Sequence, residues 1–130
     1  MSLEKMRRTV QVILDALGNR DAELSILIVD DEQIAELNRT YLQREGPTNV
    51  IAFPMNAGEF AKLNPHLIGD VVISVETARK EACSADMSFD DRFDELLIHG
   101  ILHLFGYDHE TDQRQAEVMA RKSLQLKKLL

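Results

Sequence analysis

The residues most able to do chemistry are three histidines near the C-terminal end of the chain: His99, His103 and His109. His99 and His103 are four residues apart, so on a helix their imidazoles lie on one face and can reach one metal ion. Gly106 follows, and glycine readily adopts the left-handed conformation that ends a helix, after which the chain can bring His109 to the same ion. Three imidazoles leave one of the four tetrahedral positions of zinc to water, the arrangement of catalytic zinc sites.

The helix that carries these histidines is expected to have two distinct faces, at about 100° per residue. The stripe that contains the histidines is formed by Arg92, Glu95, Leu96, His99, His103 and Gly106. A separate apolar stripe is formed by Phe93, Leu97, Ile101 and Leu104. We expect the apolar stripe to pack on the core while the histidines face a cleft. Two other interpretations stay open: histidines that only make structural hydrogen bonds, and a closed structural zinc site.

One position argues against a peptidase. The spacing matches the metallopeptidase zinc pattern H-E-x-x-H-x-x-G-x-x-H, but Gly100 stands where that pattern has its general-base glutamate. Without that carboxylate, peptide hydrolysis by the usual route lacks its proton acceptor. Another kind of metal-dependent hydrolase remains consistent with the residues.

The elements that must position the histidines follow from periodicity and capping. Helical spacing of apolar residues predicts a helix at 3–17, and a nearly continuous apolar run predicts a strand at 24–29 that is buried on both faces. Asp30 and Gln33 form a capping pair for the next helix. The remaining predicted elements are strands at 50–53 and 69–74, a loop at 55–67, and helices at 76–85, about 88–105 and about 111–128. The predicted fold is α/β of the α+β type, a single domain over residues 1–130 with helices packed on a small mixed sheet.

Composition limits the classes of protein further. The 130 residues are 45% apolar, which fits one globular domain. The net charge of −7 excludes a uniformly basic nucleic-acid binder but allows a local basic patch. The single cysteine, Cys83, excludes an internal disulfide, and a reducing, cytoplasmic compartment is the simplest interpretation. With no apparent targeting segment or membrane-spanning run, we expect no membrane partner.

The histidine segment also resembles a known family. Residues 99–109 (HGILHLFGYDH) match every fixed position of the H-G-x-L-H-L-x-G-Y-D-H signature of the YbeY family, the bacterial rRNA-maturation endoribonucleases. Residues 47–54 (PTNVIAFP) resemble the family's P-T-[DN]-V-L-S-F-P, and residues 68–74 (IGDVVIS) resemble its L-G-D-[IV]-x-I-S strand. The helix that contains Tyr41 resembles its L-N-x-x-Y-R helix end. The resemblance extends over about residues 24–119.

The resemblance implies a fold, a cofactor and a substrate. It implies a single α/β domain with one zinc ion held by His99, His103 and His109. It also implies hydrolysis of single-stranded RNA, maturation of the 3′ end of 16S rRNA, a part in ribosome quality control, and ribosomal small-subunit proteins as further partners. The family has arginine after the tyrosine, whereas Leu42 stands here and Arg44 is the nearest arginine. Arg44 is therefore the candidate for holding phosphate in the catalytic site.

Two aspartates are candidates for supporting roles. Asp70, at the start of a predicted strand, is a candidate proton acceptor, with a turn or cap as its alternative role. Asp108 can orient a metal-bound histidine from outside the ligand set, or it can cap the last helix. Thr48 and Asn49 either line the cleft or shape the turn that follows Pro47.

RNA requires positive charge near the site despite the acidic composition. The local candidates are Arg7, Arg8, Arg39, Arg44, Arg121, Lys122, Lys127 and Lys128. Each of them fits a solvated helix face as well. RNA binding is therefore an expectation from the resemblance and not from the composition.

Three functions are consistent with these residues. The first is a zinc-dependent, single-strand-specific endoribonuclease of rRNA processing, which the open coordination position favours. The second is a ribosome-assembly factor with structural zinc and weak or no catalysis, which the leucine after Tyr41 favours. The third is another metal hydrolase such as a peptidase, against which Gly100 counts.

Overall fold

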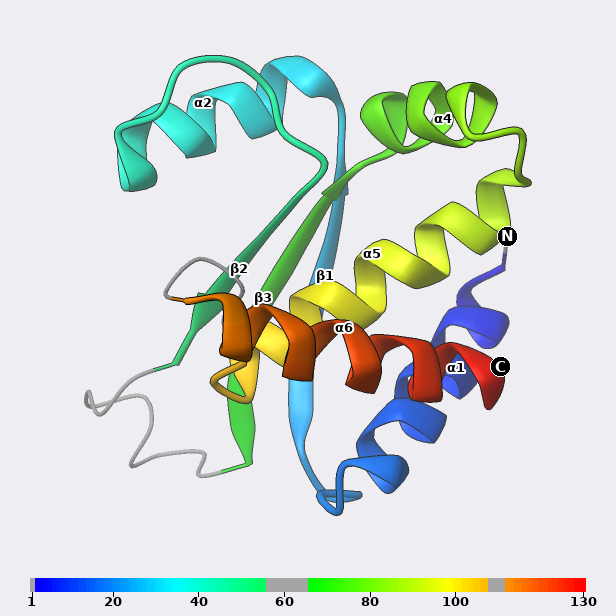
Figure 1. Cartoon of the computed structure of the whole chain (residues 1–130). Helices are drawn as coiled ribbons and strands as arrows, with labels where there is room; N and C mark the ends of the chain where they lie inside the picture. The colour runs from blue at the N-terminus through cyan, green and yellow to red at the C-terminus, as the bar shows by residue number, and fades with distance from the viewer. Residues whose placement is uncertain (1, 56–65, 108–111) are drawn as a thin grey trace.

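The computed structural model describes residues 2–55, 66–107 and 112–130 (Figure 1). Its helices are α1 (Leu3–Ala16), α2 (Asp31–Leu42), α4 (Val75–Ser84), α5 (Phe89–Leu104) and α6 (Gln113–Lys128). Its strands are β1 (Glu23–Val29), β2 (Val50–Pro54) and β3 (Leu67–Ser74). All of these elements were predicted, and each bound predicted from the sequence lies within two residues of its observed position. The predicted loop at 55–67 falls mostly outside the described residues.

The strands form a mixed sheet in the order β1-β3-β2, as expected for the α+β type. β1 runs parallel to β3, and β2 runs antiparallel to it. β3 is the central strand, and its residues Val71, Val72 and Ile73 are at most 2% exposed. Because side chains alternate along a strand, Val71 and Ile73 face one side of the sheet and Val72 faces the other.

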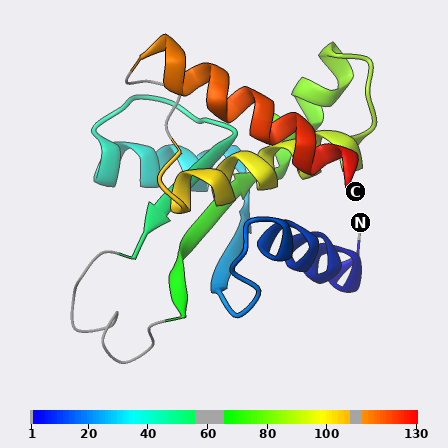
Figure 2. The same ribbon diagram turned by 60° about the horizontal axis from the view of Figure 1, so that its bottom comes forward.

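Helices cover the two sides of the sheet unequally (Figures 1 and 2). The larger core lies on the side of Val71 and Ile73, where α5 packs on the sheet and α6 and α1 pack around α5. The main members contributed by α5 are Phe93, Leu97, Ile98, Ile101 and Leu102. A smaller cluster on the other side joins Ile34 of α2 to Ile51 and Val72. The apolar stripe of α5 therefore packs on the core as expected.

The prediction that β1 is buried on both faces is wrong. Leu27 is 43% exposed and Ile28 is 44% exposed. The reason is topological, because β1 lies at the edge of the sheet with β3 as its only partner strand among the described residues. A continuous apolar run cannot distinguish an edge strand from a central one.

The helix starts show why these segments become helical at these points. The Asp30 carboxylate accepts a hydrogen bond from the Gln33 amide at 2.8 Å, and the Gln33 side chain accepts from the Asp30 amide at 3.1 Å, which confirms the predicted capping box. A serine or aspartate side chain also accepts a backbone amide at the start of each other described helix, at Ser2, Ser74, Ser88 and Asp112. No helix in the described part of the chain is both long and apolar enough to cross a membrane.

A partly buried polar contact joins the start of α2 to the start of α4. The carboxylate of Asp31 accepts hydrogen bonds from the hydroxyls of Ser74 and Thr77 and from Lys80. These bonds, the Ser74 bond first, lower the pKa of Asp31 to about 2. The contact fixes α2, and hence the segment after it, relative to the end of β3.

The free energy of unfolding should therefore depend on pH through Asp31. An unfolded aspartate has a pKa of about 3.9, so the stabilisation from ionised Asp31 is complete above about pH 5 and is lost as the pH falls toward about 2. In urea titrations between these values, the wild type should lose stability more steeply than Asp31→Asn. Asp21→Asn removes an exposed carboxylate and serves as the control. Equal slopes for the wild type and Asp31→Asn would contradict the assignment.

Candidate metal centre

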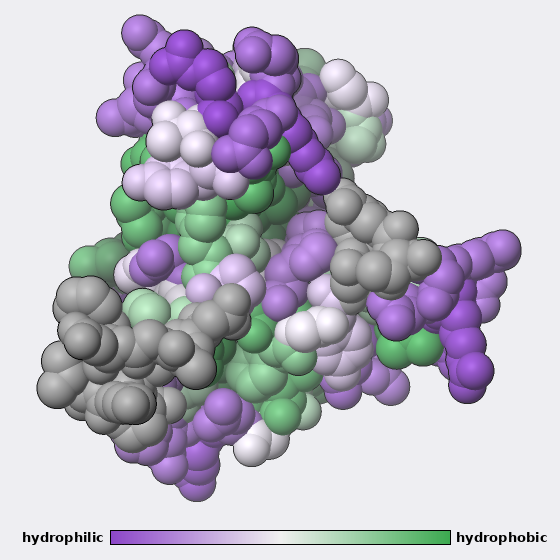
Figure 3. Space-filling view, turned by 90° about the vertical axis from the view of Figure 1, so that its left-hand side faces the viewer, coloured by the Kyte–Doolittle hydropathy of each residue, from purple (hydrophilic) through white to green (hydrophobic). Residues whose placement is uncertain are grey.

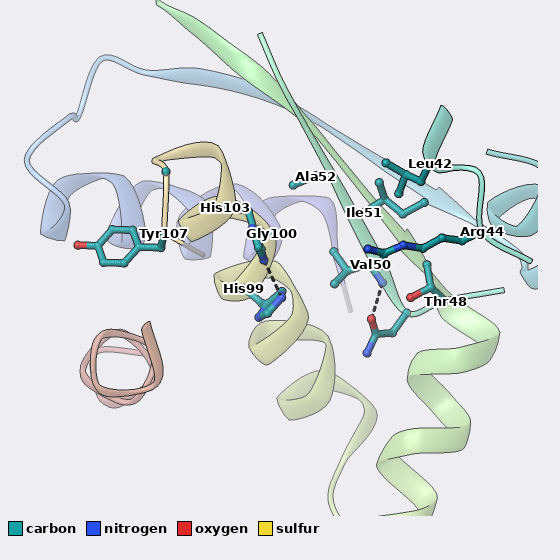
Figure 4. A pocket seen from close by; sticks show the side chains of 12 residues that line it. Leu42, Arg44, Thr48, Val50, Ile51, Ala52, His99, Gly100, His103 and Tyr107 are labelled. Carbon is teal, nitrogen blue, oxygen red and sulfur yellow. Dashed lines mark hydrogen bonds between the residues drawn. The ribbon is translucent and has the colours of Figure 1, made fainter. Parts of the chain in front are cut away.

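His99 and His103 point toward each other from the last two turns of α5, as predicted from their spacing (Figure 4). Their Nε2 atoms are 3.1 Å apart, and their ring centroids are 4.7 Å apart. Two nitrogens bound at 2.0–2.1 Å to one tetrahedral zinc ion would lie about 3.3 Å apart. A separation of 3.1 Å fits two ligands of one ion, and it is also the distance of a hydrogen bond between the two rings.

The end of α5 explains how the chain turns after these histidines. Gly106 has φ of +93°, and its amide donates to the carbonyl of His103 at 3.0 Å. The amide of Tyr107 donates to the carbonyl of Leu102 at 3.0 Å. These two bonds form a Schellman motif, which requires the left-handed conformation that glycine adopts without strain. The predicted role of Gly106 as the end of the helix is confirmed.

The third predicted ligand, His109, lies outside the described residues, as does Asp108. Among the residues that the structure describes, no group of three His, Cys, Asp or Glu side chains is arranged to hold a metal ion. The structure thus brings two of the three predicted ligands, His99 and His103, next to each other. Zinc binding and the role of His109 stay predictions.

Gly100 brings α5 close to the sheet. A Cβ atom at this position would lie 2.6 Å from Cγ1 of Val71 and 3.3 Å from Cγ2 of Val50. Real Cβ contacts below 3.0 Å are essentially never seen, so any larger residue would push the helix and strand apart. Gly100 therefore places its neighbour His99 beside β2, and no carboxylate can take the place of the peptidase glutamate here.

The histidines line an open cavity of about 610 Å³ between α5, β2 and the segment that follows α2. The opposite wall includes Leu42, Arg44 and Thr48, and Figure 4 shows the Arg44 side chain extending back toward β2. In Figure 3 this side of the molecule is a recessed surface of mixed hydrophobic and hydrophilic residues. Arg44 and Thr48, both expected near the catalytic cleft, therefore line this cavity.

A buried asparagine holds the segment that carries Arg44. Asn38 is 4% exposed, its carbonyl accepts from the Arg44 amide at 3.2 Å, and its side chain donates to the carbonyl of Gly46 at 3.0 Å. Asn38 is the asparagine of the L-N-x-x-Y-R motif, but its positioning role was not predicted from the sequence. The available signal was a polar residue four positions after the buried Ile34, on the same face of α2.

Asp70 does not line the cavity described above. It pairs with Phe53 and Ser25 across the sheet, and its carboxylate accepts a hydrogen bond from the Ser25 hydroxyl. Because it alternates with Val71, its side chain lies on the face of the sheet opposite α5. The structure therefore does not bring Asp70 together with the two histidines, and it places Asp70 within β3 rather than in the turn or cap that was its alternative predicted role.

Asn49 is a cavity residue whose side-chain orientation is fixed. Its Nδ2 atom donates to both carboxylate oxygens of Glu81 at 3.2 Å, and its Oδ1 atom accepts from the Val50 amide at 2.7 Å. A carboxylate only accepts and a backbone amide only donates, so this pair of contacts defines which end of the side chain is nitrogen. Arg92 in turn donates to Glu81 from Nε at 3.1 Å and from Nη2 at 2.9 Å.

The same charge network extends to α6. Glu95 accepts from Arg92 at 2.9 Å and from Lys127 at 2.7 Å. Burial would raise the pKa of Glu95, but these two cations more than compensate, so its pKa is lower than usual. The predicted basic residue Lys127 is therefore neutralised locally and is not a free cation on a solvated helix face.

Comparison with known proteins identifies the family. A family model described as "Endoribonuclease YbeY" matches residues 1–130. A protein named endoribonuclease YbeY from Syntrophotalea carbinolica is 47% identical over 130 residues, covering 93% of this chain and 87% of that protein. Another of that name from Geobacter metallireducens is 49% identical over 118 residues, covering 91% of this chain and 77% of that protein. The chain belongs to the endoribonuclease YbeY family.

A solved structure supports the fold. The solution structure of TM1509 from Thermotoga maritima aligns with a TM-score of 0.66 and 23% identity, covering 98% of this chain and 79% of that one. Membership of the YbeY family confirms the resemblance seen in the sequence. It also shows that the chain belongs to a family of RNA-cleaving hydrolases rather than of peptidases.

Gly100→Ala should destabilise the protein, although alanine is the better helix former. Propensity alone predicts a gain of about 1 kcal/mol in the free energy of unfolding. The contact with the buried Val71 should reverse this to a loss of about 1–3 kcal/mol, measured by urea denaturation. Ser84→Ala at the exposed end of α4 is the control and should change stability by less than about 0.5 kcal/mol. A stabilised Gly100→Ala protein would show that the helix and sheet can separate freely.

Proposed function

We propose that this protein is a zinc-dependent endoribonuclease that hydrolyses single-stranded RNA. Its place would be rRNA processing, in maturation of the 3′ end of 16S rRNA and in ribosome quality control. The exposed free thiol of Cys83 is compatible with a reducing, cytoplasmic compartment.

One observation carries the proposal. In a chain of the endoribonuclease YbeY family, His99 and His103 bring their Nε2 atoms within 3.1 Å of each other in a cavity that Arg44 also lines. Imidazole nitrogens are ligands for zinc, and a guanidinium suits phosphate. The cavity thus combines a candidate metal site with a phosphate-binding group.

The roles of the residues follow from their chemistry. His99, His103 and His109 would hold the zinc ion, which when bound supplies an acidified water and a Lewis acid for phosphoryl oxygen. Arg44 would hold the scissile phosphate through charge-assisted hydrogen bonds, in place of the arginine that the family has where Leu42 stands. Asp108 would orient a liganding histidine. The proton acceptor has no candidate among the described cavity residues, since Asp70 lies on the other face of the sheet.

A second candidate function is supported by Leu42. This leucine lines the cavity where the family motif has arginine. If Arg44 does not replace that arginine, the protein would act as a ribosome-assembly factor that binds rRNA or small-subunit proteins, with zinc in a structural role.

The proposed metal site can be tested by measuring bound zinc. The purified protein should bind about one zinc ion per chain, and both His103→Ala and His109→Ala should lose most of it, as measured by elemental analysis after dialysis. His66→Ala removes the fourth histidine, which does not line the cavity, and should keep its zinc. Full zinc content in His103→Ala would contradict the proposed ligand set.

The proposed catalytic activity can be tested by measuring cleavage of RNA. The wild type should cleave single-stranded RNA, and His103→Ala or chelation of the metal should abolish cleavage. Arg44→Ala should lower kcat/KM by about 10–150-fold, which corresponds to loss of a charged hydrogen bond of about 1.5–3 kcal/mol. Leu42→Arg in the Arg44→Ala background should restore part of the activity. A zinc-loaded wild type that leaves all single-stranded RNA intact would favour the assembly-factor function.

A further inference from the structure

A second cavity lies directly beside the histidines, between α5 and α6. Its volume is about 450 Å³. It shares Asn49, Val50 and His99 with the first cavity, so the two cavities are adjacent. Figures 1 and 2 show α5 and α6 side by side along this part of the molecule. A strand of RNA bound at the histidines therefore has this second space within reach of its next nucleotide.

We propose that the second cavity is a subsite for a nucleobase of the RNA, one nucleotide away from the phosphate bound at the histidines. This inference rests on the endoribonuclease function proposed above. It assigns the phosphate to the histidine cavity and the neighbouring base to the cavity between α5 and α6.

The walls of the second cavity favour a flat, largely apolar group. Its lining includes the exposed Ala120 and Leu124 of α6, with Leu96 and Ile98 of α5 contributing little surface because they are 3% and 1% exposed. Leu124 is 58% exposed, so a ligand lying against it would remove apolar surface from water. Ala120 is small and leaves room for a ring beside it. Apolar walls with a few fixed polar groups are typical of small-molecule sites.

The charges of the second cavity argue for a base rather than a phosphate. Its charged residues are Arg92, Glu95 and Lys127, and Glu95 binds both cations. Arg92 also binds Glu81 at 2.9 Å. The cations are thus compensated by carboxylates within the protein, and the cavity has little attraction for a further anion. A neutral base meets no such penalty, whereas the histidine cavity presents Arg44 to phosphate.

The polar contact for this base is Asn49, at the junction of the two cavities. Glu81 fixes its amide group, and Glu81 is itself held by Arg92 from α5. An amide held in one orientation loses little side-chain entropy when it binds a ligand. An Nδ2 group has two hydrogens, and two carboxylate oxygens at an equal distance of 3.2 Å are the pattern of one shared hydrogen. The second hydrogen is then directed to the edge of the base, with Glu81 as a positioning residue.

The test fills the second cavity without touching the first. Ala120→Phe places a ring in the proposed base site, and Gln125→Phe places the same ring on the exposed surface of α6 as the control. Wild type and variants are compared on a single-stranded RNA series that grows by one nucleotide on either side of the cleaved bond. The thermal unfolding midpoint of each variant is recorded to monitor the fold.

For the wild type, one added nucleotide on one side should raise kcat/KM by about tenfold, as expected for burying a base edge. Ala120→Phe should lose this gain and still cleave the shortest substrate at the wild-type kcat, whereas Gln125→Phe should keep the gain. An Ala120→Phe protein with the wild-type dependence on length would overturn the subsite. So would an equal loss on every substrate, which would point to damage of the fold and not to a lost base site.

A binding measurement separates the subsite from the catalytic function. With the metal chelated to prevent cleavage, Ala120→Phe should weaken binding of a fluorescent single-stranded RNA 12-mer by about 5–20-fold, and Gln125→Phe should not. If no single-stranded RNA is cleaved but Ala120→Phe alone loses binding, the endoribonuclease function fails and the base site stands. If RNA is cleaved and both variants bind it equally well, the function stands and the base site fails.

Discussion

The close contact between Gly100 and Val71 determines where the site lies. With no side chain at Gly100, α5 approaches the sheet near enough for a hypothetical Cβ atom to lie 2.6 Å from Cγ1 of Val71. This approach puts His99 beside β2 and His103 one turn further along the same face. It also makes the segment before β2 and the histidines two walls of one cavity. A larger residue would separate these walls even if every polar side chain were kept.

The polar groups that line the cavity are held in place by further polar residues behind them. Asp31 joins α2 to the end of β3, Asn38 holds the backbone that carries Arg44, and Glu81 holds Asn49. None of these contacts involves His99 or His103 directly. Such supports matter because a misplacement of about 1 Å at a reacting centre can cost about 100-fold in rate.

The sequence was sufficient for the features that depend on local spacing. The elements, the capping box at Asp30, the glycine turn at Gly106 and the pairing of His99 with His103 are all set within a few residues, and all were predicted correctly. The features that depend on the pairing of distant segments were not predicted correctly. The exposure of β1 depends on the strand order, and the position of Asp70 away from the histidines depends on the sheet register with Ser25 and Phe53. Neither follows from periodicity.

The acidic net charge of −7 looks unfavourable for an RNA-binding protein, but the distribution of charge resolves the difficulty. Affinity for a phosphate depends on the potential at the site, and the screening length at physiological salt is about 8 Å. Acidic residues on distant helices therefore weaken the potential at Arg44 only slightly. Beside the histidines, Glu81 and Glu95 are bound to Arg92 and Lys127 and do not repel a strand as isolated carboxylates would. In the proposed function Arg44 holds the phosphate beside this locally neutral groove, and such an arrangement would favour specific placement of RNA over general adhesion to it.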